Sequence, residues 1–165
     1  RENNLETLRE FYMKKLCIWL LIVALAVLCL GYVLFINKID TKYAVAFAEV
    51  FSAYDMDKIN HYLADETVII CNNKRTKYAE LRDNVENACR EKKYRFDDSY
   101  GHENNRLENN IREIRVYLYG TFAGKNIGET NVLMRLRKIG LFKFEIVSLE
   151  CNEPVFEYIF YGNKQ

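Results

Sequence analysis

The feature that most constrains this chain is an uncharged apolar run, LCIWLLIVALAVLCLGYVLFI, at residues 16–36. It contains no charged residue, proline, asparagine or glutamine. An α-helix rises about 1.5 Å per residue, so the run would extend roughly 31 Å, the thickness of a bilayer's hydrocarbon core. The sequence therefore predicts a transmembrane helix, and its membrane-spanning positions include Leu16, Trp19, Leu25, Leu30 and Ile36.

A cleaved signal peptide is the main alternative. Its apolar stretch is typically ~7–15 residues long and precedes a small-residue cleavage site. Here the run is longer and ends in the bulky residues 32–36, which favours a retained anchor. More basic residues precede the span than closely follow it: Arg1, Arg9, Lys14 and Lys15 against Lys38 and Lys42. The positive-inside tendency then predicts a single-pass protein of the cell membrane, with a cytoplasmic N-terminus and an exported C-terminal domain.

These features divide the chain into a cytoplasmic amphipathic segment at 1–15, the transmembrane helix at 16–36 and one exported domain at 37–165. Apolar residues at helical spacing make 5–16 amphipathic, so this segment either continues the transmembrane helix, lies on the membrane surface or packs against a partner. From Lys38 onward the chain has 20 basic and 20 acidic residues. This neutral balance argues against nucleic acid as a partner, because phosphate binding needs a basic surface.

The apolar spacing in the domain predicts helices first and a sheet after them. Steps of three and four residues predict helices at 41–54 and 77–92, and Thr76 is predicted to cap the second. Between them we expect a short helix capped by Asp57 and a β-branched strand at 67–71.

From residue 94 the period changes to two. The predicted strands are 114–122, 132–137, 142–149 and 155–161, and the polar stretch 101–110 is predicted to be a loop. Long strands joined by short turns are antiparallel neighbours. The fold class is therefore α+β, with three helices packed on a curved antiparallel sheet.

The segment 46–68, AFAEVFSAYDMDKINHYLADETV, resembles the opening of NTF2-like (SnoaL-like) domains. Those domains begin with a helix, an acidic GD-x-D turn, a second helix ending in L-x-D-D and a first strand. Here Tyr54 stands where many members have glycine, and Asp65 with Glu66 supplies the acidic pair. The resemblance continues through the third helix and the meander, over residues 41–162. It implies a cone-shaped fold, often dimeric, in which a curved sheet wraps on helices.

Enzymes that resemble this fold use an Asp/His or Tyr/Asp set that points into the cone. The domain has two histidines, His61 and His102, and neither has an acidic partner at a spacing that indicates a dyad. The inward positions of the strands are apolar, which indicates a packed core. We find no catalytic, phosphate-binding or metal-binding motif, so we expect neither an enzyme nor a cofactor nor a metal.

The cysteines of the domain are Cys71, Cys89 and Cys151. They form no C-x-x-C pair and no Cys/His cluster with metal-ligand spacing. We expect three buried thiols. A Cys71–Cys151 disulfide is the alternative, since both residues fall on or beside predicted strands and an exported domain meets an oxidising compartment.

The solvent side of two predicted strands combines aromatic and basic residues: Arg115, Tyr117 and Tyr119 on one, and Arg135 and Arg137 on the next. Tyrosine and arginine are enriched at interface hot spots, so we predict a protein interface on the convex side of the sheet. The alternative is a solvated sheet face whose arginines pair with Glu113, Glu129 or Glu145. An anionic polymer or lipid headgroup is a third, less favoured ligand.

A short cytoplasmic tail, one span and an exported NTF2-like domain resemble the layout of VirB8-type components of type IV secretion and conjugation machines. That resemblance implies a non-catalytic, membrane-anchored assembly component of a bacterial envelope complex, with protein partners and possible self-association. The alternatives are a membrane-tethered ligand-binding or sensory domain with an apolar pocket in the cone and, less favoured, a SnoaL-like enzyme.

Overall fold

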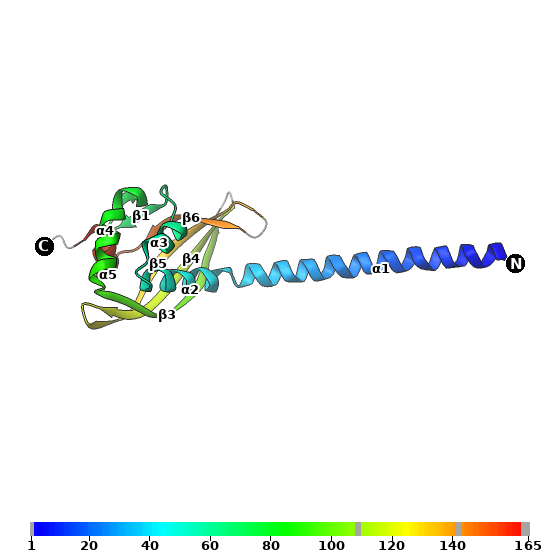
Figure 1. Cartoon of the computed structure of the whole chain (residues 1–165), viewed down its shortest axis with the longest axis horizontal. Coiled ribbons are helices and arrows are strands. Elements are labelled where there is room, and N and C mark those ends of the chain that lie inside the picture. The colour runs from blue at the N-terminus through cyan, green and yellow to red at the C-terminus, as the bar shows by residue number, and fades with distance from the viewer. Residues whose placement is uncertain (1, 108–109, 141–142, 163–165) are drawn as a thin grey trace. The chain divides into compact units, whose positions relative to one another are not determined.

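The computed structural model describes residues 2–107, 110–140 and 143–162, with side chains for all of these except 2–11, 35–37 and 103–107. The chain divides into two compact units, Arg1–Lys38 and Ile39–Gln165 (Figure 1). The first unit contains helix α1, and the second contains six strands and four helices within the described ranges.

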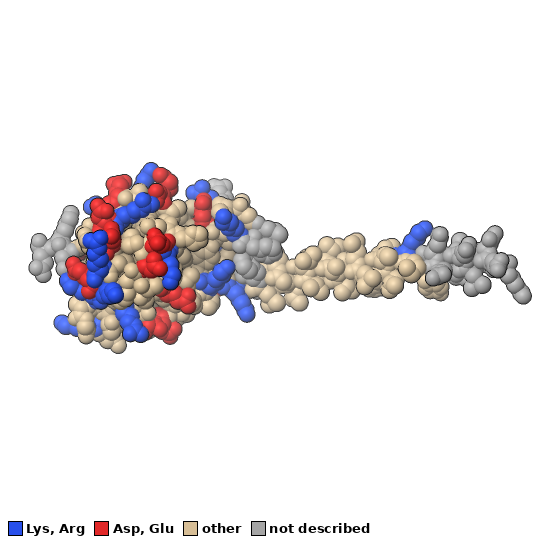
Figure 2. Space-filling view, in the orientation of Figure 1, with Lys and Arg blue, Asp and Glu red and all other residues tan. Residues whose placement is uncertain are grey.

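Helix α1 runs without a break over Glu2–Asn37. Its stretch Tyr12–Leu34 is long and apolar enough to cross a membrane, a character that a signal sequence shares. Figure 2 shows most of this stretch as a surface without charged side chains, with basic side chains only near its N-terminal end, where Lys14 and Lys15 lie. The predicted membrane-spanning side chains of Leu16, Trp19, Leu25 and Leu30 are exposed, and that of Ile36 lies outside the described side chains. The segment 5–16 continues this helix, one of the three alternatives left by the sequence.

The second unit is built on a six-stranded sheet with the strand order β2-β1-β6-β5-β4-β3. The strands are β1 Val68–Cys71, β2 Lys74–Lys77, β3 Tyr94–Leu107, β4 Ile111–Phe122, β5 Lys125–Lys138 and β6 Phe144–Glu150. Strand β1 runs parallel to β6, and the other paired neighbours are antiparallel. The predicted α+β class with a curved sheet is confirmed (Figure 1).

Helices α2 Ile39–Ser52, α3 Met56–Tyr62, α4 Tyr78–Glu91 and α5 Pro154–Tyr161 complete the domain. Two predicted caps are wrong. Helix α3 is capped by Asp55 and not by Asp57, because the Asp55 carboxylate accepts the backbone N–H of Asp57 at 3.0 Å. Thr76 lies in β2, a strand that the sequence did not predict, and α4 begins after Lys77 without a side-chain cap.

The predicted strand at 155–161 is wrong, because these residues form helix α5. Pro154 occupies the first turn, where its missing N–H costs nothing. The apolar run VFEYIFY fits either period, since Phe156 and Phe160 share a helical face as readily as a strand face. Five of its side chains are buried. With α5, the described part of the domain has four helices, one more than the three predicted.

The predicted loop at 101–110 is also wrong over most of its length, because β3 extends to Leu107. Residues 108 and 109 lie outside the described ranges. Strand β3 is an edge strand with bulges near Phe96 and Glu103. Among its described side chains, those of Arg95, Asp97, Asp98 and His102 are exposed, so the hydrophobic alternation that starts at residue 94 ends after residue 96. The predicted strands at 114–122, 132–137 and 142–149 correspond to β4, β5 and β6; Phe142 lies outside the described ranges.

An aromatic cluster fills the space between the helices and the sheet. Phe47 of α2 is fully buried, and its ring lies 4.5 Å from that of Phe51 and 6.2 Å from those of Phe96 and Phe156. The inward side chains of β4 and β5, which are Ile114, Val116, Leu118, Val132, Met134 and Leu136, have no exposed surface. This part of the cone is a packed core, as its apolar strand positions predicted.

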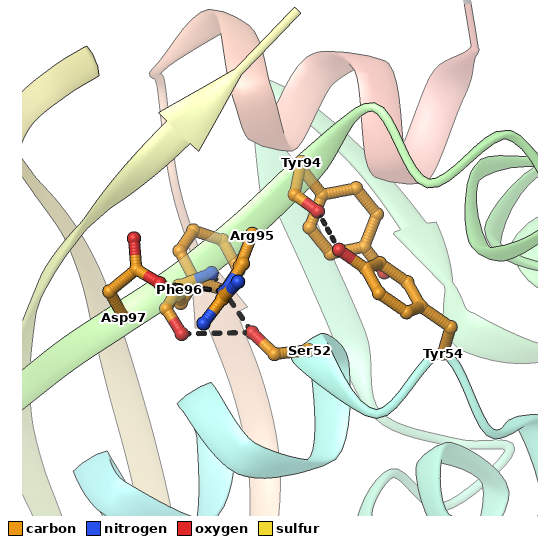
Figure 3. A network of polar contacts seen from close by, with 6 residues as sticks. All are labelled: Ser52, Tyr54, Tyr94, Arg95, Phe96 and Asp97. Carbon is orange, nitrogen blue, oxygen red and sulfur yellow. Dashed lines mark hydrogen bonds and ion pairs between the residues drawn. The ribbon is translucent and has the colours of Figure 1, made fainter. Parts of the chain in front are cut away.

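Polar contacts join the C-terminal end of α2 to the sheet edge at β3 (Figure 3). The Ser52 hydroxyl accepts the Phe96 N–H at 2.9 Å and donates to the Phe96 carbonyl at 3.1 Å, so it takes the place of a neighbouring strand. The Tyr54 hydroxyl donates to the Tyr94 carbonyl, and Arg95 forms an ion pair with Asp97 at 2.7 Å. These contacts cover part of an edge strand that would otherwise expose unpaired backbone groups.

Buried tyrosines make the stability of the domain sensitive to alkaline pH. Tyr78 is fully buried and donates to Asn60 Oδ1 at 2.7 Å, and burial raises its pKa from 10.0 to about 12. The folded state therefore holds this proton more tightly than the unfolded state. The contribution of Tyr78 to the free energy of unfolding is therefore complete below pH 10 and is lost as the pH rises from 10 to 12.

We expect Tyr78→Phe to flatten this alkaline loss. Each pKa unit corresponds to about 1.4 kcal/mol, so Tyr78 accounts for roughly 2 to 3 kcal/mol between pH 10 and pH 12. Urea unfolding at pH 8, 10 and 12 measures the effect, with Tyr12→Phe, at an exposed tyrosine, as the control. Equal pH dependence in the wild type and Tyr78→Phe would contradict the assignment.

Candidate functional site

The predicted interface residues lie together on the solvent side of the sheet. Arg115, Tyr117 and Tyr119 alternate with buried residues along β4, and Arg135 and Arg137 alternate in the same way along β5. We call the outward side chains of β3, β4 and β5 around them the outer face. All five predicted residues belong to this face, and the structure adds Tyr100 from β3, directly opposite Tyr117.

Three tyrosines form a stacked cluster on the outer face. The ring of Tyr100 lies 4.7 Å from that of Tyr117, with 15° between their planes, and 6.2 Å from that of Tyr119. Tyr119 donates to Glu129 Oε2 at 2.5 Å, and Tyr100 donates to the same oxygen at 3.3 Å. The hydrogen bond to Glu129 raises the pKa of Tyr119 well above 10, so this hydroxyl keeps its proton at physiological pH. Tyr100 is 43% exposed, so its ring is accessible to a partner.

The arginines of the outer face differ in their ion pairs. Arg135 is held between two carboxylates, at 3.0 Å from Glu113 and 3.4 Å from Glu150. Arg137 lies 3.4 Å from Glu145, and both of those side chains are largely exposed. Two of the three predicted carboxylate partners are therefore correct, whereas Glu129 binds tyrosines instead of an arginine.

Arg115 is the cation that this network leaves uncompensated. Within the described part of the chain, no carboxylate lies in ion-pair distance of its guanidinium group. Its cross-strand neighbours are His102 on β3 and Leu133 on β5. Among the described residues, the outer face therefore offers a stack of aromatic rings beside a positive charge that has no carboxylate partner.

A second feature is an open groove of about 790 Å³ between α2, α3 and the start of β6. Its lining includes Tyr43, His61, Tyr62, Lys143, Phe144 and Glu145. Tyr62 donates to the Tyr43 carbonyl at 2.8 Å and Tyr43 donates to the Phe144 carbonyl at 2.9 Å, so these tyrosines join α3 and α2 to β6. Burial raises the pKa of both hydroxyls, which keeps them neutral hydrogen-bond donors.

The two histidines lie apart from each other. His61 is exposed and lines the groove, a rim position as predicted, and His102 is exposed on β3. Within the described ranges, histidines, cysteines and carboxylates form no group of three that could hold a metal ion. On the face of the domain seen in Figure 2, acidic and basic side chains are intermixed.

No protein-family model matches the sequence, and no curated protein matches it either. The fold is similar to that of solved structures. An NTF2-like protein from Cytophaga hutchinsonii is 9% identical, with a TM-score of 0.49, over 67% of this chain and 92% of its own. An NTF2-like protein of unknown function in nutrient uptake from Rhodospirillum rubrum is 12% identical, with a TM-score of 0.48, over 67% and 93%.

A protein of unknown function with a cystatin-like fold from Nostoc punctiforme is 17% identical, with a TM-score of 0.49, over 68% of this chain and 87% of its own. Each of these is a similarity of fold alone. The α+β class of this chain follows from its own strands and helices.

Proposed function

We propose that this chain is a single-pass membrane protein whose domain acts as a non-catalytic interaction component of a bacterial envelope complex, of the type IV secretion or conjugation kind. In this proposal α1 is a retained anchor, the N-terminus is cytoplasmic and the domain is exported. The observation that carries it is the stacked tyrosine cluster beside the uncompensated Arg115 on the outer face.

The chemistry of the outer face supports one kind of partner. Tyrosine rings offer a large contact area at a low cost in side-chain entropy, and stacked rings accept apolar groups on their open surfaces. Arg115 adds one charge that a carboxylate can pair with. We therefore propose a partner protein that places an acidic side chain over Arg115 and apolar side chains against Tyr100 and Tyr117. Anchoring confines both proteins to two dimensions, which raises the effective concentration of each for the other.

The experiment is purification of the full chain from its native membrane in mild detergent, followed by mass spectrometry of proteins present at stoichiometric yield. We expect Arg115→Glu to reduce partner recovery at least about tenfold, the effect of ~1.4 kcal/mol. Arg75→Glu is the matched control, because it makes the same charge change at an exposed position on β2. Both variants should unfold within about 0.5 kcal/mol of the wild type, as surface substitutions usually do.

A photo-crosslinking residue at position 117 then identifies the contact. The proposal expects a crosslink to a different protein, near an acidic residue whose replacement by arginine restores binding to Arg115→Glu. A crosslink between two copies of this chain would indicate that the outer face serves self-association and does not bind a different protein. Equal partner recovery from Arg115→Glu and Arg75→Glu would contradict the proposal.

The groove favours a second candidate function, a membrane-tethered ligand-binding domain. Its wall combines apolar side chains such as Phe144 with the polar residues His61 and Lys143, which suits a small molecule with an apolar body and a polar end. The same purification separates the two functions. A lone monomer or dimer that carries a small molecule, detected by native mass spectrometry, would favour the groove.

A further inference from the structure

Two cysteines meet where strands β1 and β6 end. The two strands are parallel neighbours in which Ile70 lies opposite Glu150, so the residues that follow, Cys71 and Cys151, lie opposite each other. The Cys151 N–H donates to the Ile70 carbonyl at 2.9 Å, which holds the two backbones together at this point. Both side chains are 2% exposed. The fold therefore brings together two residues that are separated by 80 positions in the sequence.

The two thiols share a hydrogen bond and are chemically unequal. The bond from Cys151 lowers the pKa of the Cys71 thiol, whereas the same bond and burial raise the pKa of the Cys151 thiol well above 9. Cys71 is therefore the thiol of the pair that ionises more readily. The remaining cysteine of the domain, Cys89 on α4, pairs instead with the Tyr94 hydroxyl at 3.6 Å.

We propose that Cys71 and Cys151 are a redox pair that forms an intramolecular disulfide by exchange with a small-molecule disulfide such as oxidised glutathione. The Cys71 thiolate attacks one sulfur of the reagent, forming a mixed disulfide and releasing one thiol. The Cys151 sulfur then attacks Cys71 Sγ, forming the Cys71–Cys151 bond and releasing the second thiol. Two electrons pass to the reagent, and the two protons from the cysteines are taken up by the released thiolates.

This bond would join the end of β1 to the segment that leads from β6 into α5. Only Asn152 and Glu153 separate Cys151 from α5, and α5 supplies five buried side chains to the core. Closing so long a loop restricts the unfolded chain more than the folded one. The oxidised protein should therefore unfold at a temperature higher by roughly 10 °C. The inference does not depend on the proposed function, because the outer face and the redox pair use different residues.

The test treats the full chain, purified in detergent, with oxidised glutathione, then denatures it and alkylates the free thiols. We expect peptide mapping to find Cys71 linked to Cys151, with the intact mass lower by two hydrogen atoms. The matched control Cys89→Ser should form the same bond, and Cys71→Ser should leave Cys151 free for alkylation. Alkylation of both Cys71 and Cys151 in the oxidised wild type, or glutathione retained on Cys71, would overturn the proposal.

Discussion

Replacing Gly120 with alanine is expected to destabilise the domain by at least about 3 kcal/mol, the upper end of the cost of overpacking. Gly120 lies on β4, opposite Phe96 of β3. A Cβ atom at this position would lie 1.9 Å from the Arg95 carbonyl oxygen and 3.0 Å from the Phe96 Cα. Both are backbone atoms, which cannot rotate away as a side chain can. Strand β3 would have to move from β4, and its contacts with α2 would be lost.

Gly140→Ala is the matched control for this substitution. Among the described residues, the nearest atom to a Cβ at Gly140 is the Lys143 Cβ at 3.5 Å, which is an ordinary van der Waals distance. We expect this variant to unfold within about 0.5 kcal/mol of the wild type. Urea unfolding of the full chain in detergent, followed by near-ultraviolet circular dichroism of the tyrosines, measures both variants. A Gly120→Ala protein with the wild-type midpoint would show that β3 and β4 are not this close.

Gly120 also illustrates what the sequence can and cannot predict. Alternation along β4 and β5 predicted which residues face the core, because one buried face imposes a period of two. The close approach of β3 at Gly120 was not predictable, since it depends on a bulge near Phe96 in an edge strand with a polar sequence. Residues 155–161, which form most of α5, were predicted to be a strand for a related reason. Its side chains are buried on several sides, so their spacing carried no single period.

The outer face, too, could be predicted only in part from the sequence. Tyr117, Tyr119 and Arg115 follow from alternation along β4. Tyr100 was missed, because it lies in the strand β3, whose short alternation at residues 94–97 was not assigned to a strand and is followed by a stretch that was predicted to be a loop. The use of Glu129 by two tyrosines depends on cross-strand register, which places Tyr119 opposite Glu129. Register follows from the folded pairing of β4 and β5, so sequence spacing alone could not separate this pair from an ion pair with arginine.

Phe47→Ala is expected to have the second large effect, a loss of about 3 to 5 kcal/mol in the free energy of unfolding. Phe47 is fully buried and contacts three other elements through the rings of Tyr62, Phe96 and Phe156. Removing its ring deletes buried apolar surface and leaves a cavity, and close packing on several sides restricts the collapse that would refill it. Urea unfolding of the full chain measures this loss.

The control on the same helix is Val45→Ala, whose side chain is 38% exposed, and we expect a change below about 1 kcal/mol. The comparison also tests how closely the core packs around Phe47. A packed core requires the full loss at Phe47, since no empty space surrounds the ring. A cone that holds a ligand-sized void beside Phe47 would let neighbouring side chains relax into the gap. A loss below about 1 kcal/mol for Phe47→Ala would therefore contradict the packed core around this ring.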